Sequence, residues 1–230
     1  MKLFNFKKDP QTVIVCIHGF GQRQQDEFIP LVNYFNKYEV ITPELYDIHD
    51  PRDDEWVDWV HRAEHVLDEA ASQGKRIILI GFSMGGVLVS YCASKANVDK
   101  LVLIAPAFEY VNLPNATGFV TSLFEKKDDT PSSYPELPPN FTITFANLVN
   151  NCKPAIEDIH IPTLIIHGSD DDVILHTSSK KFIKKIPTEE KALITIEGVK
   201  HRVLDHPIGG KIALENIRLF MNNKIVVKNQ

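Results

Sequence analysis

Three kinds of side chain that act together in acyl transfer stand far apart in this sequence. Ser83 lies in the run Gly81-Phe82-Ser83-Met84-Gly85, a cluster of acids occupies 170–172, and His201 follows later. A serine hydroxyl is a weak nucleophile without a base, and histidine can serve as that base while an aspartate orients it. If the fold brings these groups together, they could attack a carbonyl carbon.

The surroundings of Ser83 favour such a role. The apolar run 77–80 before it predicts a buried strand. Val87, Leu88, Tyr91 and Cys92 after it recur at helical spacing. Gly-x-Ser-x-Gly between a strand and a helix holds the serine on a tight, exposed turn. The pattern alone could be a glycine-rich turn with a capping serine, so the strand and the helix carry the interpretation.

Strands and helices alternate along the whole chain. Strands are expected at 12–17, 39–42, 77–80, 100–104, 163–166 and 191–196. Helices are expected at 26–35, at 55–73, directly after Ser83, at 175–186 and at 207–222. This alternation predicts an α/β fold with a mostly parallel central sheet and helices on both faces. We expect a single domain over residues 1–230.

The candidate residues follow different strands. The run His18-Gly19-Phe20-Gly21 ends the first, Ser83 ends the third, and the aspartates and His201 follow the last two. The carboxyl ends of parallel strands meet at one edge of a sheet, where α/β proteins bind ligands. The order Ser, Asp, His is also that of a known hydrolase arrangement.

On these motifs the chain resembles the α/β-hydrolase superfamily, over about residues 13–220. Within it, the chain is similar to small bacterial carboxylesterases and monoacylglycerol-lipase-like enzymes. The resemblance implies an oxyanion hole formed by the backbone N–H groups of Phe20 and Met84. It also favours Asp171 as the acid, because the spacing of Gly168, Asp171 and Ile174 fits the family's turn. Asp170 and Asp172 remain alternatives. The loop 46–54 lacks the family's frequent Gly-x-Gly-x-Ser turn, and His160 and His206 are further histidines near the relevant segments.

One segment, about 106–160, breaks the alternation and is too long for an ordinary loop. It is rich in proline and aromatic residues, among them Phe119 and Phe124. The resemblance places a cap here. We expect a folded cap or lid insertion, with a disordered insertion as the alternative. Its aromatic side chains could line an acyl pocket and set the acyl length.

Composition narrows the partners. The 230 residues carry a formal net charge of −5 without a dominant basic stripe, so nucleic acid is not expected. Three widely spaced cysteines argue against a disulfide framework, and Cys16 and Cys92 are expected in the core. His61 and His65 lack further ligands, so no metal is expected. The N-terminus has no apolar centre and no run is long enough to span a membrane, which predicts a cytoplasmic protein.

These observations predict a serine carboxylesterase that cleaves a small-molecule ester with a small to medium acyl chain through an acyl-enzyme. No cofactor is required. A thioesterase, an acyltransferase or a peptidase could use the same residues. A non-catalytic small-molecule binding protein on a hydrolase scaffold is the alternative from another class. The sequence does not predict the oligomeric state.

Overall fold

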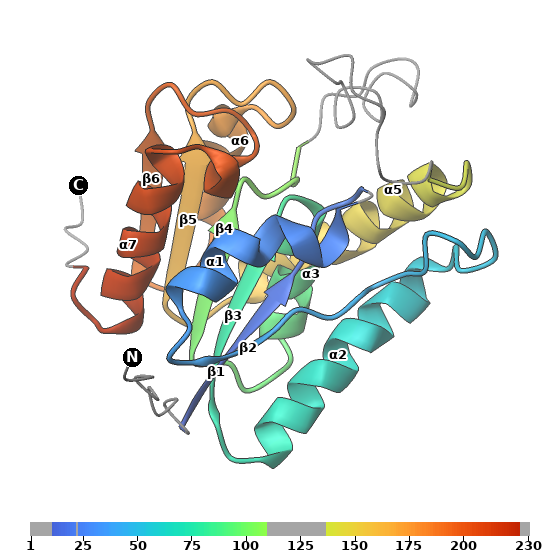
Figure 1. Cartoon of the computed structure of the whole chain (residues 1–230), viewed down its shortest axis with the longest axis horizontal. Helices are drawn as coiled ribbons and strands as arrows, with labels where there is room; N and C mark the ends of the chain where they lie inside the picture. The colour runs from blue at the N-terminus through green and yellow to red at the C-terminus, as the bar shows by residue number, and fades with distance from the viewer. Residues whose placement is uncertain (1–10, 22, 110–136, 226–230) are drawn as a thin grey trace, which may run out of the picture.

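The computed structural model of the protein describes residues 11–21, 23–109 and 137–225. This part of the chain forms one six-stranded sheet with helices on both faces (Figure 1). The strands are β1 (Thr12–Ile17), β2 (Glu39–Ile41), β3 (Arg76–Phe82), β4 (Lys100–Ile104), β5 (Thr163–Gly168) and β6 (Lys191–Ile196). Every pairing between neighbouring strands is parallel. The predicted α/β fold is confirmed, and each predicted strand is present.

The helices divide into two layers. The α-helices are α1 (Ile29–Tyr34), α2 (Trp56–Ser72), α3 (Met84–Ala93), α5 (Phe141–Cys152), α6 (His176–Phe182) and α7 (Gly209–Met221). Short 3₁₀ helices are η1 (Gln24–Phe28), η2 (Lys153–Asp158), η3 (Ile183–Lys185) and η4 (Val203–Asp205). Buried residues of α2, α3, α5 and α6 form one core cluster with the sheet, and those of α1 and α7 form a second cluster on its other face.

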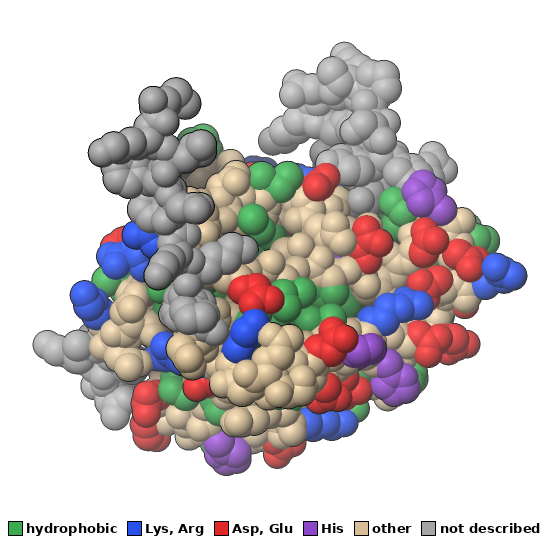
Figure 2. Space-filling model, turned by 60° about the horizontal axis from the view of Figure 1, so that its bottom comes forward, with side chains coloured by type: hydrophobic (Ala, Val, Ile, Leu, Met, Phe, Trp, Pro, Cys, Tyr) green, Lys and Arg blue, Asp and Glu red, His purple; other side chains and the backbone are tan. Residues whose placement is uncertain are grey.

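Charges of both signs are distributed over the surface. Figure 2 shows lysine, arginine, aspartate and glutamate side chains interspersed on the face that it displays. Mixed charge with a small negative net charge is typical of the surface of a globular protein. This face therefore offers no continuous basic stripe.

The two-layer architecture explains the continuous apolar runs in the sequence. All six residues of β1 are buried. Val13 and Val15 face one core cluster, whereas Ile14 and Cys16 face the other, because successive side chains of a strand point to opposite faces. A strand covered on both sides needs apolar residues at every position.

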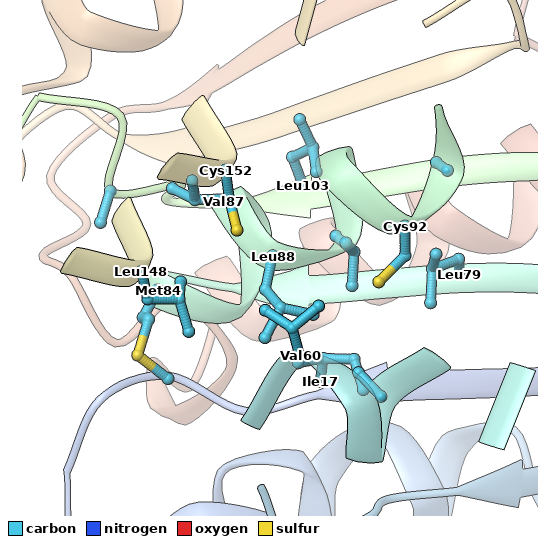
Figure 3. Close-up of a cluster of buried hydrophobic side chains, with 14 of the residues drawn as sticks. Ile17, Val60, Leu79, Met84, Val87, Leu88, Cys92, Leu103, Leu148 and Cys152 are labelled. Carbon is cyan, nitrogen blue, oxygen red and sulfur yellow. The ribbon is translucent and has the colours of Figure 1, made fainter. Parts of the chain in front are cut away.

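Helix α3, which starts directly after Ser83, is buried almost all round. Figure 3 shows Met84, Val87, Leu88 and Cys92 of this helix among Val60 from α2, Leu148 and Cys152 from α5, and residues of the sheet. Tyr91 is its one residue that is not classed as buried. Because its neighbours enclose it on most sides, the helix has little freedom to shift, and the start of the helix is fixed in place.

The topology brings the candidate residues to one edge. The strand order is β2-β1-β3-β4-β5-β6, so the chain leaves β1 toward one side of the sheet and returns to build on the other. Such a reversal creates a crevice at the carboxyl ends of the two central strands. The register pairs Ile17 with Gly81, which places the turn after β1 beside the turn after β3.

Part of the segment predicted as a cap belongs to the core. Phe141, Phe145 and Leu148 of α5 are buried against α2 and α3. Residues 110–136, including Phe119 and Phe124, lie outside the described residues. A cap in this protein is therefore a prediction about that stretch, since α5 and η2 pack onto the main body.

Candidate active site

Ser83 sits on a strained turn between β3 and α3. Its φ of 53° is in the left-handed region, which is costly for a residue with a side chain. Two backbone hydrogen bonds hold it there: the N–H of Ser83 donates to Ile104 O at 2.9 Å, and its carbonyl accepts from Ala107 N–H at 3.0 Å. The Ser83 hydroxyl therefore stands in a fixed position at the carboxyl edge of the sheet.

The flanking glycines are required by space. A Cβ atom on Gly85 would collide with the carbonyl oxygen of Ile17 at the end of β1. A Cβ atom on Gly81 would collide with the carbonyl of Gly85 and the side chain of Val89. The spacing Gly-x-Ser-x-Gly thus allows β1, β3 and α3 to approach one another closely around the serine.

Ser83, His201 and Asp171 form a continuous hydrogen-bonded chain. The Ser83 hydroxyl lies 3.1 Å from Nε2 of His201, and Nδ1 of His201 lies 2.8 Å from Oδ2 of Asp171. Because the carboxylate can only accept, Nδ1–H donates to it and leaves Nε2 free to accept the serine proton. All three side chains are buried, at 2%, 5% and 4% exposure. The fold therefore joins a serine, a histidine and an aspartate from three loops in one hydrogen-bonded chain.

A second histidine holds the same carboxylate. His167 Nε2 lies 2.8 Å from Asp171 Oδ2 and 2.8 Å from the carbonyl of Ile174, two acceptors, so Nε2 carries a proton. Its Nδ1 then accepts from the hydroxyl of Ser179 at 2.7 Å. Oδ1 of Asp171 accepts the N–H groups of Val173 and Ile174. Burial alone would raise the pKa of Asp171, but the hydrogen bonds from His167 and His201 outweigh it and hold the pKa below its ordinary value.

The other two aspartates are exposed and make their contacts on the surface. Asp170 accepts from the hydroxyl of Ser169 at 2.7 Å on the surface. Asp172 pairs with Lys200 at 2.5 Å, and its side chain is 59% exposed. Among the three consecutive acids, the structure brings Asp171 to His201.

The turn after β1 is fixed by buried polar groups. The Tyr46 hydroxyl accepts from Gly21 N–H at 2.9 Å and lies 2.9 Å from Gly21 O, to which it donates. His18 donates through Nδ1 to Gly19 O and accepts from Leu45 N–H through Nε2. Burial lowers the pKa of His18 to about 4, so it stays neutral and keeps this tautomer. Phe20 N–H lies between Gly19 N–H, which donates to Glu27, and Gly21 N–H, which donates to Tyr46.

The Met84 amide lies on the other side of the serine. Met84 is the first residue of α3, so its N–H has no acceptor inside the helix and lies at the positive end of the helix dipole. The register of β1 with β3 places the loop that carries Phe20 N–H beside this helix start. The two predicted amides thus belong to adjacent turns.

Other histidines have different surroundings. His206 accepts from Gly209 N–H through Nδ1 at the start of α7, and His160 is exposed. Across residues 11–21, 23–109 and 137–225, no three His, Cys, Asp or Glu side chains cluster in a way that could hold a metal ion. Within the same ranges, none of the helices has the length and apolar character needed to cross a bilayer.

Sequence reasoning missed three contributors to this edge: His167, Tyr46 and Glu27. His167 directly precedes Gly168 of the predicted aspartate turn, yet nothing nearby in the sequence indicated a contact with Asp171. Tyr46 lies 25 residues from its partner Gly21, and Glu27 lies 8 residues from Gly19, whose N–H it accepts. Glu27 adjoins the apolar stripe of a predicted amphipathic helix, and helical periodicity does not reveal that it is buried.

A comparison with protein families agrees with this geometry. The model of the alpha/beta hydrolase family matches residues 14–210, and the chain belongs to that family. A relative from Mycoplasma pneumoniae named "Putative esterase/lipase 3" is 29% identical over 160 residues. That match spans 63% of this chain and about half, 53%, of the relative.

Solved structures share the fold. A structure from the work on LipS and LipT, described as metagenome-derived lipolytic enzymes, has a TM-score of 0.74 at 19% identity and covers 94% of this chain and 96% of its own. The monoacylglycerol lipase of Paleococcus ferrophilus has a TM-score of 0.73 at 13% identity, with coverages of 96% and 97%. Est1E from Butyrivibrio proteoclasticus has a TM-score of 0.66 at 20% identity, with coverages of 96% and 90%. At these identities the likeness concerns the fold.

Proposed function

We propose that the protein is a serine carboxylesterase that cleaves small-molecule esters through an acyl-enzyme. The observation that carries the proposal is the chain of hydrogen bonds from Ser83 through His201 to Asp171. The three residues come from loops after different strands, so local sequence does not bring them together. A buried hydroxyl within hydrogen-bond distance of an imidazole nitrogen is the arrangement that nucleophilic acyl transfer needs.

The reaction proceeds in two halves. In the first, His201 takes the Ser83 proton as the serine oxygen bonds to the ester carbonyl carbon. The tetrahedral intermediate then expels the alcohol, which receives the proton from His201. In the second half, His201 takes a proton from water, the hydroxide oxygen attacks the acyl-enzyme, and the acid leaves as Ser83 regains its proton. Asp171 stays ionised throughout and stabilises the imidazolium.

The developing oxyanion is stabilised by Phe20 N–H and Met84 N–H. Amides held in place before the reaction act on charge that forms only in the transition state, so they raise kcat more than they change KM. Phe20 lies in the turn after β1, residues 18–21, which is called the Phe20 turn below. The contacts of Tyr46 and His18 with this turn support the assignment. No step of this mechanism needs a cofactor or a metal.

The proposed substrate class rests on the names of similar proteins and on the charge of this chain. The curated relative is named as an esterase or lipase, and the structural neighbours include lipolytic enzymes and esterases. We propose a neutral ester with a small to medium acyl chain, with its length set by residues in the stretch 110–136. The formal net charge of −5 favours a small-molecule partner over nucleic acid, and the face shown in Figure 2 carries charges of both signs.

Covalent labelling tests the proposal. A fluorophosphonate probe should modify the wild-type protein once, and peptide mass spectrometry should place the adduct on Ser83. The variant Ser83→Ala should fold normally and show neither labelling nor turnover. Ser94→Ala is a matched control, because Ser94 lies at the end of α3 and its hydroxyl bonds Tyr91 O. An adduct on another residue, or unchanged turnover in Ser83→Ala, would overturn the proposal.

A substrate panel then defines the reaction. Esters of graded acyl length, with thioesters of the same acyl groups, separate a carboxylesterase from a thioesterase. We expect faster cleavage of the oxygen esters and a preference for short to medium chains. Preferential cleavage of the thioesters would change the substrate class while leaving the nucleophile assignment intact.

A further inference from the structure

A buried carboxyl group connects the two loops that flank Ser83. Glu27 lies at the end of η1, is 8% exposed, and accepts the N–H of Gly19 through Oε2 at 2.8 Å. Gly19 directly precedes Phe20, whose amide is assigned to the oxyanion hole. The other oxygen, Oε1, faces Nη2 of Arg202 at 3.8 Å, and Arg202 directly follows His201.

Other charged groups surround Glu27 where the two loops meet. Arg202 also bonds Asp205 through Nε at 2.9 Å, and Arg23 bonds the same oxygen of Asp205 at 2.5 Å. The ring of Phe82 lies against His201 with centroids 5.0 Å apart. A narrow crevice of about 10 Å³ is lined by Glu27, Phe82, Val203, Leu204 and the two charged residues of the 202–205 loop. Glu27 thus lies where the loop of the base, the serine turn and the Phe20 turn meet.

There is little room for an alternative arrangement at this point. A Cβ atom on Gly19 would stand 3.0 Å from the ring of Phe82, 3.1 Å from Cβ of Ser83 and 3.3 Å from the carboxylate of Glu27. The Phe20 turn is therefore packed directly against Phe82 and Ser83, and the carboxylate of Glu27 holds it through Gly19 N–H. If Gly19 N–H lost its acceptor, one of the contacts that fix the turn would be lost, and a small shift of the turn would displace Phe20 N–H.

We propose that Glu27 is a positioning residue, which in its ionised form holds the Phe20 turn and ties it to the loop of His201. The inference rests on the proposed function, because it takes Phe20 N–H as an oxyanion donor. Glu27 does not touch the reacting atoms and acts through Gly19 and Arg202. Ionisation strengthens both contacts, since a carboxylate is a stronger acceptor than a carboxylic acid and attracts the guanidinium.

The protonation state of Glu27 changes within the working range of a histidine base. Burial raises the pKa of Glu27 to about 7, although Arg202, Gly19 N–H and Arg23 each lower it, and Asp205 raises it further. The charged groups that face Glu27 are these two arginines and Asp205. Protonation of Glu27 on acidification should therefore weaken its contacts with Gly19 and Arg202, loosen the turn and lower the activity.

The test compares Glu27→Gln and Glu27→Ala with the wild type, and Glu69→Gln on the exposed surface of α2 serves as the control. The readouts are kcat, KM and the rate at which a fluorophosphonate modifies Ser83, each across pH. On a logarithmic plot the acid side of the Glu27→Gln profile should have a smaller slope than that of the wild type, because the carboxyl group that titrates near pH 7 is absent from this variant.

The two variants should also differ in size of effect. Glu27→Ala should lower kcat and the labelling rate by less than about 100-fold with little change in KM, because an oxyanion donor is displaced but not deleted. Glu27→Gln should recover part of that loss, since its amide oxygen still accepts Gly19 N–H, although the neutral side chain no longer attracts Arg202. A purely structural role would predict neither the change of slope nor the recovery.

Thermal unfolding gives a readout that does not depend on catalysis. A carboxyl group whose pKa is raised by folding stabilises the protein below its unfolded pKa, and this contribution is lost as pH rises through the folded pKa. At about pH 8 the melting temperature of Glu27→Gln should therefore exceed that of the wild type by at least about 2 °C. At about pH 4 the two melting temperatures should be equal. An unchanged melting point at both pH values would contradict the raised pKa.

The outcomes separate the two proposals. If the wild type is not labelled on Ser83, the proposed function fails and the inference falls with it. If the wild type is labelled and Glu27→Ala reacts as fast, the proposed function stands and the positioning role is wrong. If Glu27→Gln keeps the wild-type slope, the ionised form of Glu27 is not required. Arg202→Gln provides a second variant, since removal of its charge should move the acid side of the profile to higher pH.

Discussion

Two buried carboxyl groups lie at the same edge of the sheet, and folding shifts their pKa values in opposite directions. Asp171 is 4% exposed and Glu27 is 8% exposed. The pKa of Asp171 falls below its ordinary value, whereas that of Glu27 rises to about 7. Burial opposes ionisation at both sites, so the difference comes from the groups that face each carboxylate.

The number and quality of the donors decide the outcome. Asp171 accepts two backbone N–H groups on one oxygen and two imidazole N–H groups on the other, all at 2.8–2.9 Å. Glu27 accepts the amide of Gly19, and its arginine stands 3.8 Å away. A fully satisfied carboxylate remains charged and can stabilise an imidazolium. A partly satisfied one can respond to pH, which suits a residue that modulates rather than performs the chemistry.

The largest expected effect is at Asp171. Replacement of Asp171 by Asn should lower kcat by about 10⁴-fold, because the wrong imidazole tautomer would face Ser83. The measurement is kcat on one ester. Asp170→Asn and Asp172→Asn are matched controls on the neighbouring surface positions, and each should keep kcat within about twofold of the wild type, since exposed pairs contribute little. A larger loss in either control would transfer the role of the acid to that residue.

His167 should show an intermediate effect. His167→Gln removes one of the four donors to Asp171, and a hydrogen bond to a charged group contributes about 1.5–3 kcal/mol to stability. We expect the free energy of unfolding to fall by about 2 kcal/mol and kcat by about tenfold. Urea unfolding and steady-state kinetics measure the two. Ser179→Ala, which removes the partner on the far side of His167 but leaves its donor to Asp171, should lower kcat less. Equal losses would mean that His167 acts only as packing.

A smaller but sharper effect concerns the sign of the pH dependence. The carboxylate of Asp171 stabilises the fold above its unfolded pKa, and this contribution is lost as pH falls, because folding lowers its pKa. Asp171→Asn should therefore be destabilised most at neutral pH and approach the wild type in acid. Glu27→Gln should show the opposite sign, with its gain greatest above about pH 7. Melting temperatures of both variants, measured relative to the wild type across pH, test this prediction. Differences that change in the same direction with pH would contradict the contrast between the two carboxyl groups.

Local patterns in the sequence were enough to predict the order of the six strands and to single out Ser83 and His201, which the structure joins by a hydrogen bond. Gly81 and Gly85 mark the Ser83 turn because a side chain at either position would collide with backbone. Continuous apolar runs mark strands that are buried on both faces, such as β1. The choice of Asp171 over its neighbours followed from the resemblance, because its spacing to Gly168 fits the family's turn, and Asp171 is the aspartate that contacts His201.

Long-range contacts account for what was missed. Helix α5 carries Phe141, Phe145 and Leu148 at helical spacing, but proline-rich sequence around it favoured a cap instead of a core helix. The contact between Glu27 and Arg202 joins residues 175 positions apart, and only the packing of η1 against η4 creates it. No local pattern reports whether a glutamate next to an apolar stripe is buried.

Direct detection of an acyl-enzyme on Ser83 tests the central claim most directly. The protein would be mixed with p-nitrophenyl acetate, quenched in acid within the first turnover and digested for peptide mass spectrometry. The account predicts one acetyl group on the peptide that contains Ser83, formed as p-nitrophenol is released in a burst, and no such adduct in Ser83→Ala. Hydrolysis of the ester with no burst and no acetylated Ser83, or an acetyl group on another residue, would contradict it.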